Sequence, residues 1–157
     1  MTSTQQHSPF SIGVIAFVIA IGVSIGYFQF VYLPTINLKP VVAQEILEPL
    51  TTTEIKMIEG STNPQQQDNF MPKLVQVELA VNNKVIWINE DGIGHTVTTD
   101  NDAIDRYTGR FDSLDTIGLV QPGQTYEFLF TQEGEFPYHC EPHPWMTGMV
   151  KVLKQKF

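Results

Sequence analysis

A thiol, an imidazole and a thioether recur at three-residue intervals near the C-terminus of the chain. Cys140, His143 and Met146 stand in the run Tyr-His-Cys-Glu-Pro-His-Pro-Trp-Met-Thr-Gly at 138–148. We expect this run to form a loop between two short strands. A single tight loop can then bring all three side chains around one point, where they could bind a metal ion that accepts nitrogen and sulfur ligands.

The metal that fits such a set is copper, provided that a second imidazole joins it. Two imidazoles, one thiolate and a weak axial thioether form the ligand set of a blue-copper electron-transfer centre. Of the four histidines, His7 precedes a long apolar segment, and His139 adjoins Cys140 on a strand whose successive side chains point to opposite faces. His95 remains, after a strand and a turn. The predicted ligands of one copper ion are therefore His95, Cys140, His143 and Met146.

Several other interpretations of these residues stay open. Zinc also binds thiolate and imidazole, although structural zinc sites rarely include a thioether. His139 and Met149 are alternative ligands, and the whole set could be core filler because Cys and Met are often buried. We expect Trp87 to lie in the core and Trp145 to be partly exposed at the rim of the metal site.

The elements that must position these ligands are short strands. Alternating or β-branched runs recur between turn signals such as Asp91-Gly92 and Pro122-Gly123, with no convincing helical stripe among them. The predicted strands are 54–58, 74–79, 85–89, 95–99, 125–130, 136–139 and 149–153. This pattern predicts an all-β fold, a Greek-key β-sandwich that occupies residues 54–157.

An apolar segment precedes the predicted sandwich. Residues 10–33 are almost wholly apolar and no charged side chain occurs before Lys39. Twenty-four helical residues reach about 36 Å, enough to cross a bilayer core of roughly 30 Å. We predict a tail at 1–9, a transmembrane helix at 10–33 that Pro34 ends, and a spacer at 34–53.

A cleaved signal peptide is the competing interpretation of this segment. Val41-Val42-Ala43 is a conceivable small-residue cleavage site. Against cleavage stand the missing basic n-region and an apolar run longer than the usual 7 to 15 residues.

Charge and cysteine usage exclude some functions. The 157 residues hold nine Lys and Arg against seventeen Asp and Glu, a net charge of −8. A nucleic-acid partner is not expected because phosphate backbones require clustered basic side chains. The lone Cys140 excludes an intramolecular disulfide framework. We interpret the acidic stretch 100–115 as a solvated face, with a docking patch as the alternative.

Four stretches of the sequence resemble the plastocyanin, halocyanin and amicyanin group of cupredoxins. They are Val-Ile-Trp-Ile-Asn-Glu-Asp-Gly-Ile-Gly-His-Thr-Val at 85–97, Phe-Asp-Ser at 111–113, Pro-Gly-Gln-Thr-Tyr-Glu-Phe at 122–128, and Gly-Glu-Phe-Pro-Tyr-His-Cys-Glu-Pro-His-Pro-Trp-Met at 134–146. The short Cys-x-x-His-x-x-Met spacing is similar to the ligand loop of amicyanin. The resemblance implies that the sulfur of Cys140 accepts a backbone N–H bond, and that Thr96 donates it.

The resemblance implies a type 1 blue-copper protein with one copper per chain that carries single electrons and is not an enzyme. Its expected partners are redox proteins of a membrane electron-transport chain. The expected location is the cell membrane, single-pass, with the copper domain on the extracytoplasmic side. The alternatives are a subunit of a copper oxidase or reductase, and a copper-storage protein. An enzyme would need a further metal site, and the sequence offers no spare His cluster for one. A storage protein would favour several exposed Met or Cys donors, whereas Cys140 and Met146 belong to one closed set.

Overall fold

The computed structural model describes residues 9–36 and 41–155, and it divides the chain into two compact units, Met1–Lys39 and Pro40–Phe157. Residues 1–8 of the predicted tail, including His7, therefore lie outside the described residues. Lys39 lies outside them too.

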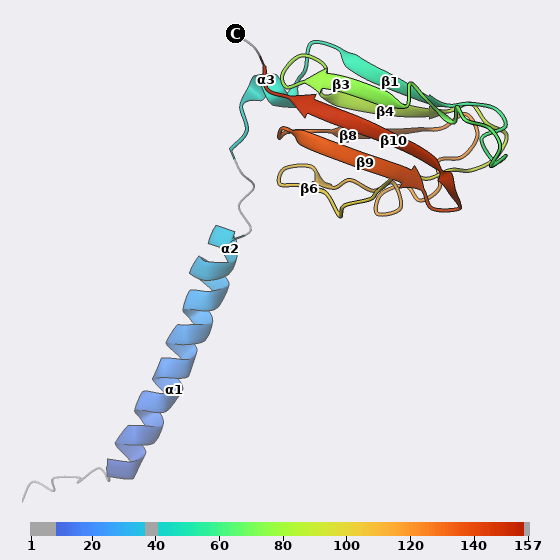
Figure 1. The fold of residues 1–157 in the computed structure, drawn as a ribbon. Coiled ribbons are helices and arrows are strands. Elements are labelled where there is room, and N and C mark those ends of the chain that lie inside the picture. Colours follow the sequence, from blue (N-terminus) through green and yellow to red (C-terminus); the bar gives the residue numbers. More distant parts are fainter. Residues whose placement is uncertain (1–8, 37–40, 156–157) are drawn as a thin grey trace, which may run out of the picture. The chain divides into compact units, whose positions relative to one another are not determined.

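The N-terminal unit is helical throughout its described part. Helix α1 (Pro9–Tyr27) continues through the π-helical turn η1 (Phe28–Tyr32) into α2 (Leu33–Ile36) (Figure 1). Residues Ile12–Ile36 have a mean hydropathy of 2.2 over their most apolar window. A helix of this length and composition can cross a membrane.

Pro34 does not end the helix, so this detail of the prediction was wrong. The helix continues to Ile36, and a π-helical turn immediately precedes the proline, with the N–H of Leu33 donating to the carbonyl of Phe28. Helices accommodate a residue that lacks an N–H through a local irregularity of this kind.

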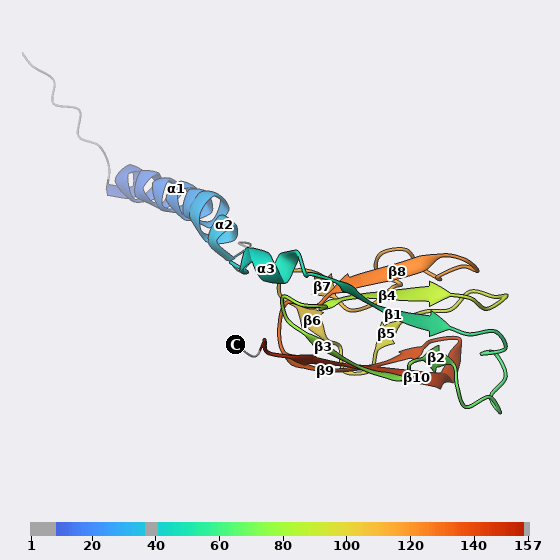
Figure 2. The ribbon, with the colours of Figure 1, turned by 90° about the horizontal axis from the view of Figure 1, so that it is seen from above.

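The C-terminal unit begins with a short helix, α3 (Gln44–Leu47), and then consists of strands. The strands are β1 (Thr52–Met57), β2 (Phe70–Met71), β3 (Leu74–Glu78), β4 (Lys84–Asn89), β5 (Thr98–Thr99), β6 (Ile104–Asp105), β7 (Gly109–Arg110), β8 (Thr125–Leu129), β9 (Gly134–Cys140) and β10 (His143–Leu153). Two four-stranded sheets have the orders β2-β1-β4-β8 and β3-β10-β9-β5, and β6 pairs with β7. Figure 2 shows β8, β4 and β1 in one layer and β3, β9 and β10 in the other.

The connectivity confirms the predicted β-sandwich. β1 runs parallel to β4, and β3 runs parallel to β10, although the members of each pair are distant in sequence. The chain therefore crosses between the sheets instead of forming successive hairpins within one sheet. Such crossing connections are typical of Greek-key sandwiches.

Aromatic side chains from both sheets fill the space between the layers. Alternate residues of β4, β8, β9 and β10 are buried, as strand geometry requires. Trp87 is fully buried, as predicted, and its ring centroid lies 5.4 Å from that of Phe111 and 5.5 Å from that of Tyr138. This rigid core fixes the strands whose ends carry the predicted copper ligands.

Parts of the segment predicted as a spacer pack on the sandwich. The buried amide of Asn83 donates from Nδ2 to the carbonyls of Ile46, at 2.9 Å, and Phe130, at 2.7 Å. Helix α3 is therefore attached to the end of the domain. The boundaries 34–53 and 54–157 remain predictions.

The acidic stretch 100–115 differs from the predicted solvated face. Asp105 and Asp112 are buried. One carboxylate oxygen of Asp105 accepts the N–H groups of Tyr107 and Thr108, and the other accepts the N–H of Thr131 at 2.6 Å. These two carboxylates hold turns together, because each replaces backbone acceptors that the turns lack.

Candidate metal centre

Three of the predicted ligands meet at one end of the sandwich. The Sγ atom of Cys140 lies 3.6 Å from Nδ1 of His95 and 3.5 Å from Nδ1 of His143. Metal–nitrogen bonds of about 2.0 Å and metal–sulfur bonds of about 2.3 Å, at trigonal angles, separate such donors by roughly 3.6–3.8 Å. The spacing therefore suits one metal ion bound by all three atoms.

The β9–β10 hairpin positions two of these donors. Cys140 is the last residue of β9 and pairs with His143, the first residue of β10, so β10 begins six residues earlier than the predicted strand at 149–153. The register shifts between His143 and Thr147. An irregularity of this kind re-aims side chains, and here Met146 lies within it, fully buried.

His95 comes from the opposite side of the site. It forms an isolated bridge with Val120, in which the N–H of each residue donates to the carbonyl of the other at 3.1 and 2.8 Å. The predicted strand 95–99 thus shortens to β5, Thr98–Thr99. The two backbone bonds fix the Cα of His95, and its ring is completely buried.

Asp91 determines which nitrogen of His95 is free to bind a metal. Nε2 of His95 lies 2.9 Å from Oδ2 of Asp91. A carboxylate only accepts hydrogen bonds, so in the neutral ring Nε2 carries the proton and Nδ1 presents its lone pair toward Cys140. The sequence analysis missed Asp91. The available signal was an acidic residue in the turn four positions before a predicted histidine ligand.

The environment of Asp91 favours its charged form. Burial by itself would raise the pKa of the carboxyl group, but hydrogen bonds from His95 and from the N–H groups of Gly92 and Gly60 outweigh burial and lower the pKa below its usual value. The carboxylate oxygen Oδ1 accepts the N–H groups of Gly92, at 2.8 Å, and Gly60, at 3.1 Å. All these partners stabilise the negative charge.

Cys140 receives the backbone hydrogen bond that was predicted for it. The N–H of Thr96 donates to the sulfur at 3.3 Å, and the hydroxyl of Thr96 accepts the N–H of Glu141 at 2.8 Å. Burial raises the pKa of the Cys140 thiol, and the N–H bond from Thr96 offsets only part of this effect. Without metal the sulfur is therefore a protonated thiol at neutral pH.

His143 is the most accessible of the three donors. It is half-buried, and its ring centroid lies 5.0 Å from that of His95 and 5.3 Å from that of Trp145. Burial, followed by the charge of His95, lowers the pKa of His143. An imidazole that stays neutral at physiological pH is ready to bind a metal.

Trp145 is half-buried, in agreement with the predicted partial exposure. Its Nε1 donates to the carbonyl of Ser61 at 3.0 Å. Ser61 belongs to the connection between β1 and β2, for which the sequence analysis made no prediction. The ligand hairpin is thus attached to a second loop at the same end of the domain.

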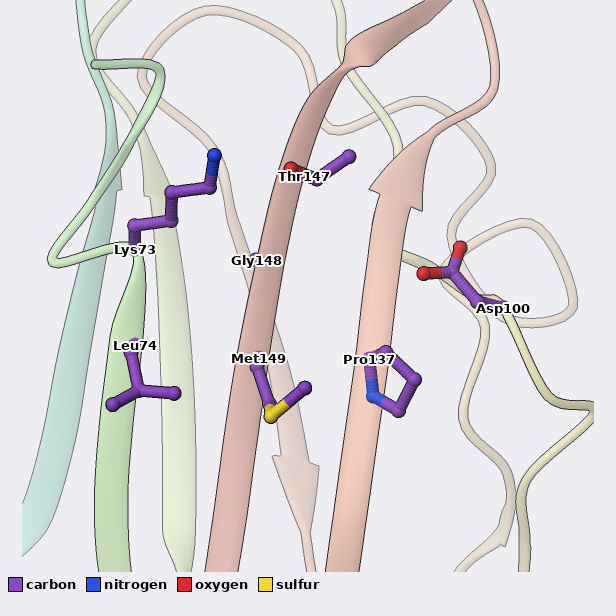
Figure 3. Close-up of a pocket in the computed structure, with 7 residues that line it drawn as sticks. All are labelled: Lys73, Leu74, Asp100, Pro137, Thr147, Gly148 and Met149. Carbon is purple, nitrogen blue, oxygen red and sulfur yellow. The ribbon is translucent and has the colours of Figure 1, made fainter. Parts of the chain in front are cut away.

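The other candidate ligands point elsewhere. His139 is hydrogen-bonded through Nδ1 to Asp100, and its Nε2 lies 3.6 Å from Glu141, on the outer face of the sheet. Met149 lines a shallow pocket on that outer face beside Leu74 and Pro137 (Figure 3). Among the described residues, His95, Cys140 and His143 are the group of His, Cys or acidic side chains close enough to share a metal ion.

The donor chemistry fits copper. Two imidazole nitrogens and one sulfur converge within 4.8 Å, and a buried thioether follows on the same hairpin. Two neutral imidazoles and a thiolate suit copper in both of its common oxidation states, and a thioether is a soft ligand that zinc sites rarely use.

Comparison with known proteins agrees with this chemistry. A chloroplastic plastocyanin from Chlamydomonas reinhardtii is 30% identical over 86 residues, which cover 55% of this chain and 58% of the plastocyanin sequence. An amicyanin from Paracoccus denitrificans is 31% identical over 78 residues, which cover 49% and 54%. The chain thus spans little more than half the length of these curated relatives.

A solved structure and a family model extend the likeness to most of the sandwich. The purple cupredoxin from Nitrosopumilus maritimus superimposes with a TM-score of 0.51 at 25% identity, over 64% of this chain and 99% of that one. The model of copper binding proteins of the plastocyanin/azurin family matches residues 59–153, which is more than half of the chain. The protein therefore belongs to the plastocyanin/azurin family of copper-binding proteins and is a cupredoxin of the type 1 copper class.

Proposed function

We propose that this cupredoxin is a membrane-tethered electron carrier whose copper is held by His95, Cys140, His143 and Met146. The observation that carries the proposal is the buried arrangement in which Nδ1 atoms of two histidines lie 3.6 and 3.5 Å from one cysteine sulfur. The donor set is that of a blue-copper centre.

The protein's contribution to electron transfer is a rigid set of donors. Bound copper supplies the one-electron redox chemistry. His95 is held by two backbone bonds to Val120, and Cys140 by its strand and by the N–H of Thr96. Donors fixed in this way move little when the charge of the centre changes, and a small reorganisation favours fast electron transfer.

The exit route in this proposal is the ring of His143. It is the half-buried donor, and the neighbouring Pro142 and Pro144 are exposed. Exposed apolar side chains also occur around the His95 loop, with Ile93 at 42% and Leu119 at 40% exposure. An apolar rim around one accessible ligand suits the small, short-lived contacts that redox partners make.

The helix Pro9–Ile36 would serve as the tether. Attachment to a bilayer raises the local concentration of the carrier near membrane-bound redox proteins. The expected location is the extracytoplasmic side of the cell membrane. With a net charge of −8, steered partners should present basic surfaces.

A copper titration of the full chain in detergent tests the electron-transfer proposal. Cu(II) should produce an intense thiolate-to-copper absorption band that saturates at one copper per chain and that reverses on reduction. Cys140→Ser should abolish the band. Saturation well above one copper would favour storage, and substrate turnover by the purified protein alone would favour an enzyme.

Membrane fractionation tests the tether separately. The full-length protein should remain in the membrane after an alkaline carbonate wash, and protease added outside the cell should reach the copper domain. A mature protein that starts at Gln44 in mass spectrometry would refute the anchor, because it would show cleavage after Ala43.

A further inference from the structure

Asp91 is a buried carboxylate in the turn that leads to the proposed copper ligand His95. The residue is 8% exposed and lies between the end of β4 and His95. Its neighbour Glu90 provides a contrast, because that carboxylate is 44% exposed and pairs with Lys56 at 2.6 Å. Buried charged side chains are uncommon unless they form an ion pair or coordinate a metal ion.

Among the described residues, the ion-pair partner of Asp91 is His95. The two oxygens of the carboxylate have different partners, since Oδ2 lies 2.9 Å from Nε2 of His95 while Oδ1 accepts the N–H groups of Gly60 and Gly92. One oxygen thus anchors the carboxylate to the backbone of two loops. The other is held against the ring of the histidine.

Among the described residues, His143 has no equivalent carboxylate partner. Within the described part of the chain, its recorded polar contact is the sulfur of Cys140, and its remaining neighbours are the rings of His95 and Trp145. The two imidazoles are therefore unequal. His95 is buried and in direct contact with a carboxylate, whereas His143 is half-buried and, among the described residues, is hydrogen-bonded to none.

We infer that Asp91 is a positioning residue that fixes the ring and tautomer of His95 and lowers the reduction potential of the copper. The inference rests on the proposed ligand set. A carboxylate that accepts the Nε2 proton makes the imidazole a stronger donor at Nδ1. Cu(II) carries one more positive charge than Cu(I), so a buried negative charge at this distance stabilises the oxidised ion more than the reduced one.

Asp91→Asn is the matched perturbation, because it keeps the size of the side chain and removes its charge. An amide cannot accept from His95 on one side and from two backbone N–H groups on the other, since one of its ends is a donor. We expect the preference for Cu(II) over Cu(I) to fall at least tenfold, which corresponds to a rise in reduction potential of about 59 mV for a one-electron couple.

The experiment compares reduction potentials of the copper-loaded full chain in detergent by redox titration of the absorption band. Asp91→Asn should keep the absorption band and raise the reduction potential by at least about 59 mV, which corresponds to the tenfold fall in the preference for Cu(II). Asp91→Glu, which retains the charge, should recover part of the shift, and Glu90→Gln, the same change one residue earlier, should leave the preference within twofold of the parent. If the preference for Cu(II) over Cu(I) in Asp91→Asn stays within twofold of the parent value, the inference is overturned.

A measurement on the unmodified protein covers the case in which Asp91→Asn does not load copper. In the diamagnetic Cu(I) form, nitrogen-15 NMR should show Nε2 of His95 protonated and its proton slow to exchange with solvent. A fast-exchanging or absent Nε2 proton on His95 would overturn the inference. Failure of the parent protein to give a thiolate-to-copper band would instead refute the proposed ligand set, so the two failures are distinguishable.

Discussion

Gly148→Ala should destabilise the domain because the space for a side chain is already filled by Tyr138. Gly148 pairs with Tyr138 across β9 and β10, and a Cβ atom at position 148 would lie 2.3 Å from Cζ of Tyr138 and 2.4 Å from its hydroxyl oxygen. Carbon atoms in contact are about 3.5–4.0 Å apart, so the ring must move by more than about 1 Å.

The ring has little freedom to move. Tyr138 is fully buried, and its centroid lies 4.9 Å from that of Phe70 and 5.5 Å from that of Trp87. Overpacking of a dense core costs about 1–3 kcal/mol, and this position belongs at the upper end, about 2–3 kcal/mol. At roughly 4 °C per kcal/mol for a domain of this size, the melting temperature should fall by about 10 °C.

Denaturant unfolding of the metal-free chain in detergent measures this loss. The matched control is Gly92→Ala, because an added Cβ there would have no heavy atom within 4 Å; its free energy of unfolding should be unchanged or slightly raised. A Tyr138→Leu background should remove most of the penalty of Gly148→Ala. An equal penalty in both backgrounds would refute the packing argument.

Three further predictions concern the copper site and the acidic segment. Met146→Leu should keep the thiolate-to-copper band and raise the reduction potential, because loss of the axial sulfur destabilises Cu(II); an unchanged potential in voltammetry would place the axial ligand elsewhere. Asp105→Ala should lower the free energy of unfolding by about 2–3 kcal/mol, since it leaves several turn N–H groups without an acceptor. Asp102→Asn, at a side chain that is 89% exposed, should change it by less than about 0.5 kcal/mol, because Asn also tolerates the positive φ of this position. Acidification should weaken Cu(II) binding roughly tenfold per pH unit between pH 8 and 7, because the raised pKa of Cys140 means that copper must displace one thiol proton. Because burial lowers the pKa of His143, competition from a second proton begins at a lower pH than it would for a free imidazole. A Cu(II) binding constant that does not change between pH 8 and 7 in a chelator competition would contradict the raised pKa of Cys140.

The strand pattern and the presence of several donors on one hairpin were predictable because they depend on local rules. Alternating burial and turn signals place strands, and the three-residue spacing of Cys140, His143 and Met146 puts donors of the right chemistry on one hairpin. The family and the sandwich are confirmed by the comparisons and by the topology. The four-ligand assignment itself remains a prediction, although the structure brings the two histidines and the cysteine together.

The parts that sequence reasoning missed depend on contacts between distant segments. Nothing local shows that Asp105 reaches Thr131, or that the N–H of Gly60 reaches Asp91. A run of acidic residues looks solvated until the turns that need the carboxylates are known. The early start of β10 at His143 was also missed, because prolines on both sides of that residue are typical of a loop.

The most direct test of the copper site is anomalous diffraction at the copper edge from crystals of the loaded protein. The account predicts one copper peak per chain, within bonding distance of Nδ1 of His95, Sγ of Cys140 and Nδ1 of His143, with the sulfur of Met146 as the fourth and weaker neighbour. A principal peak that lacks Cys140, or one that lies at His139, would contradict it.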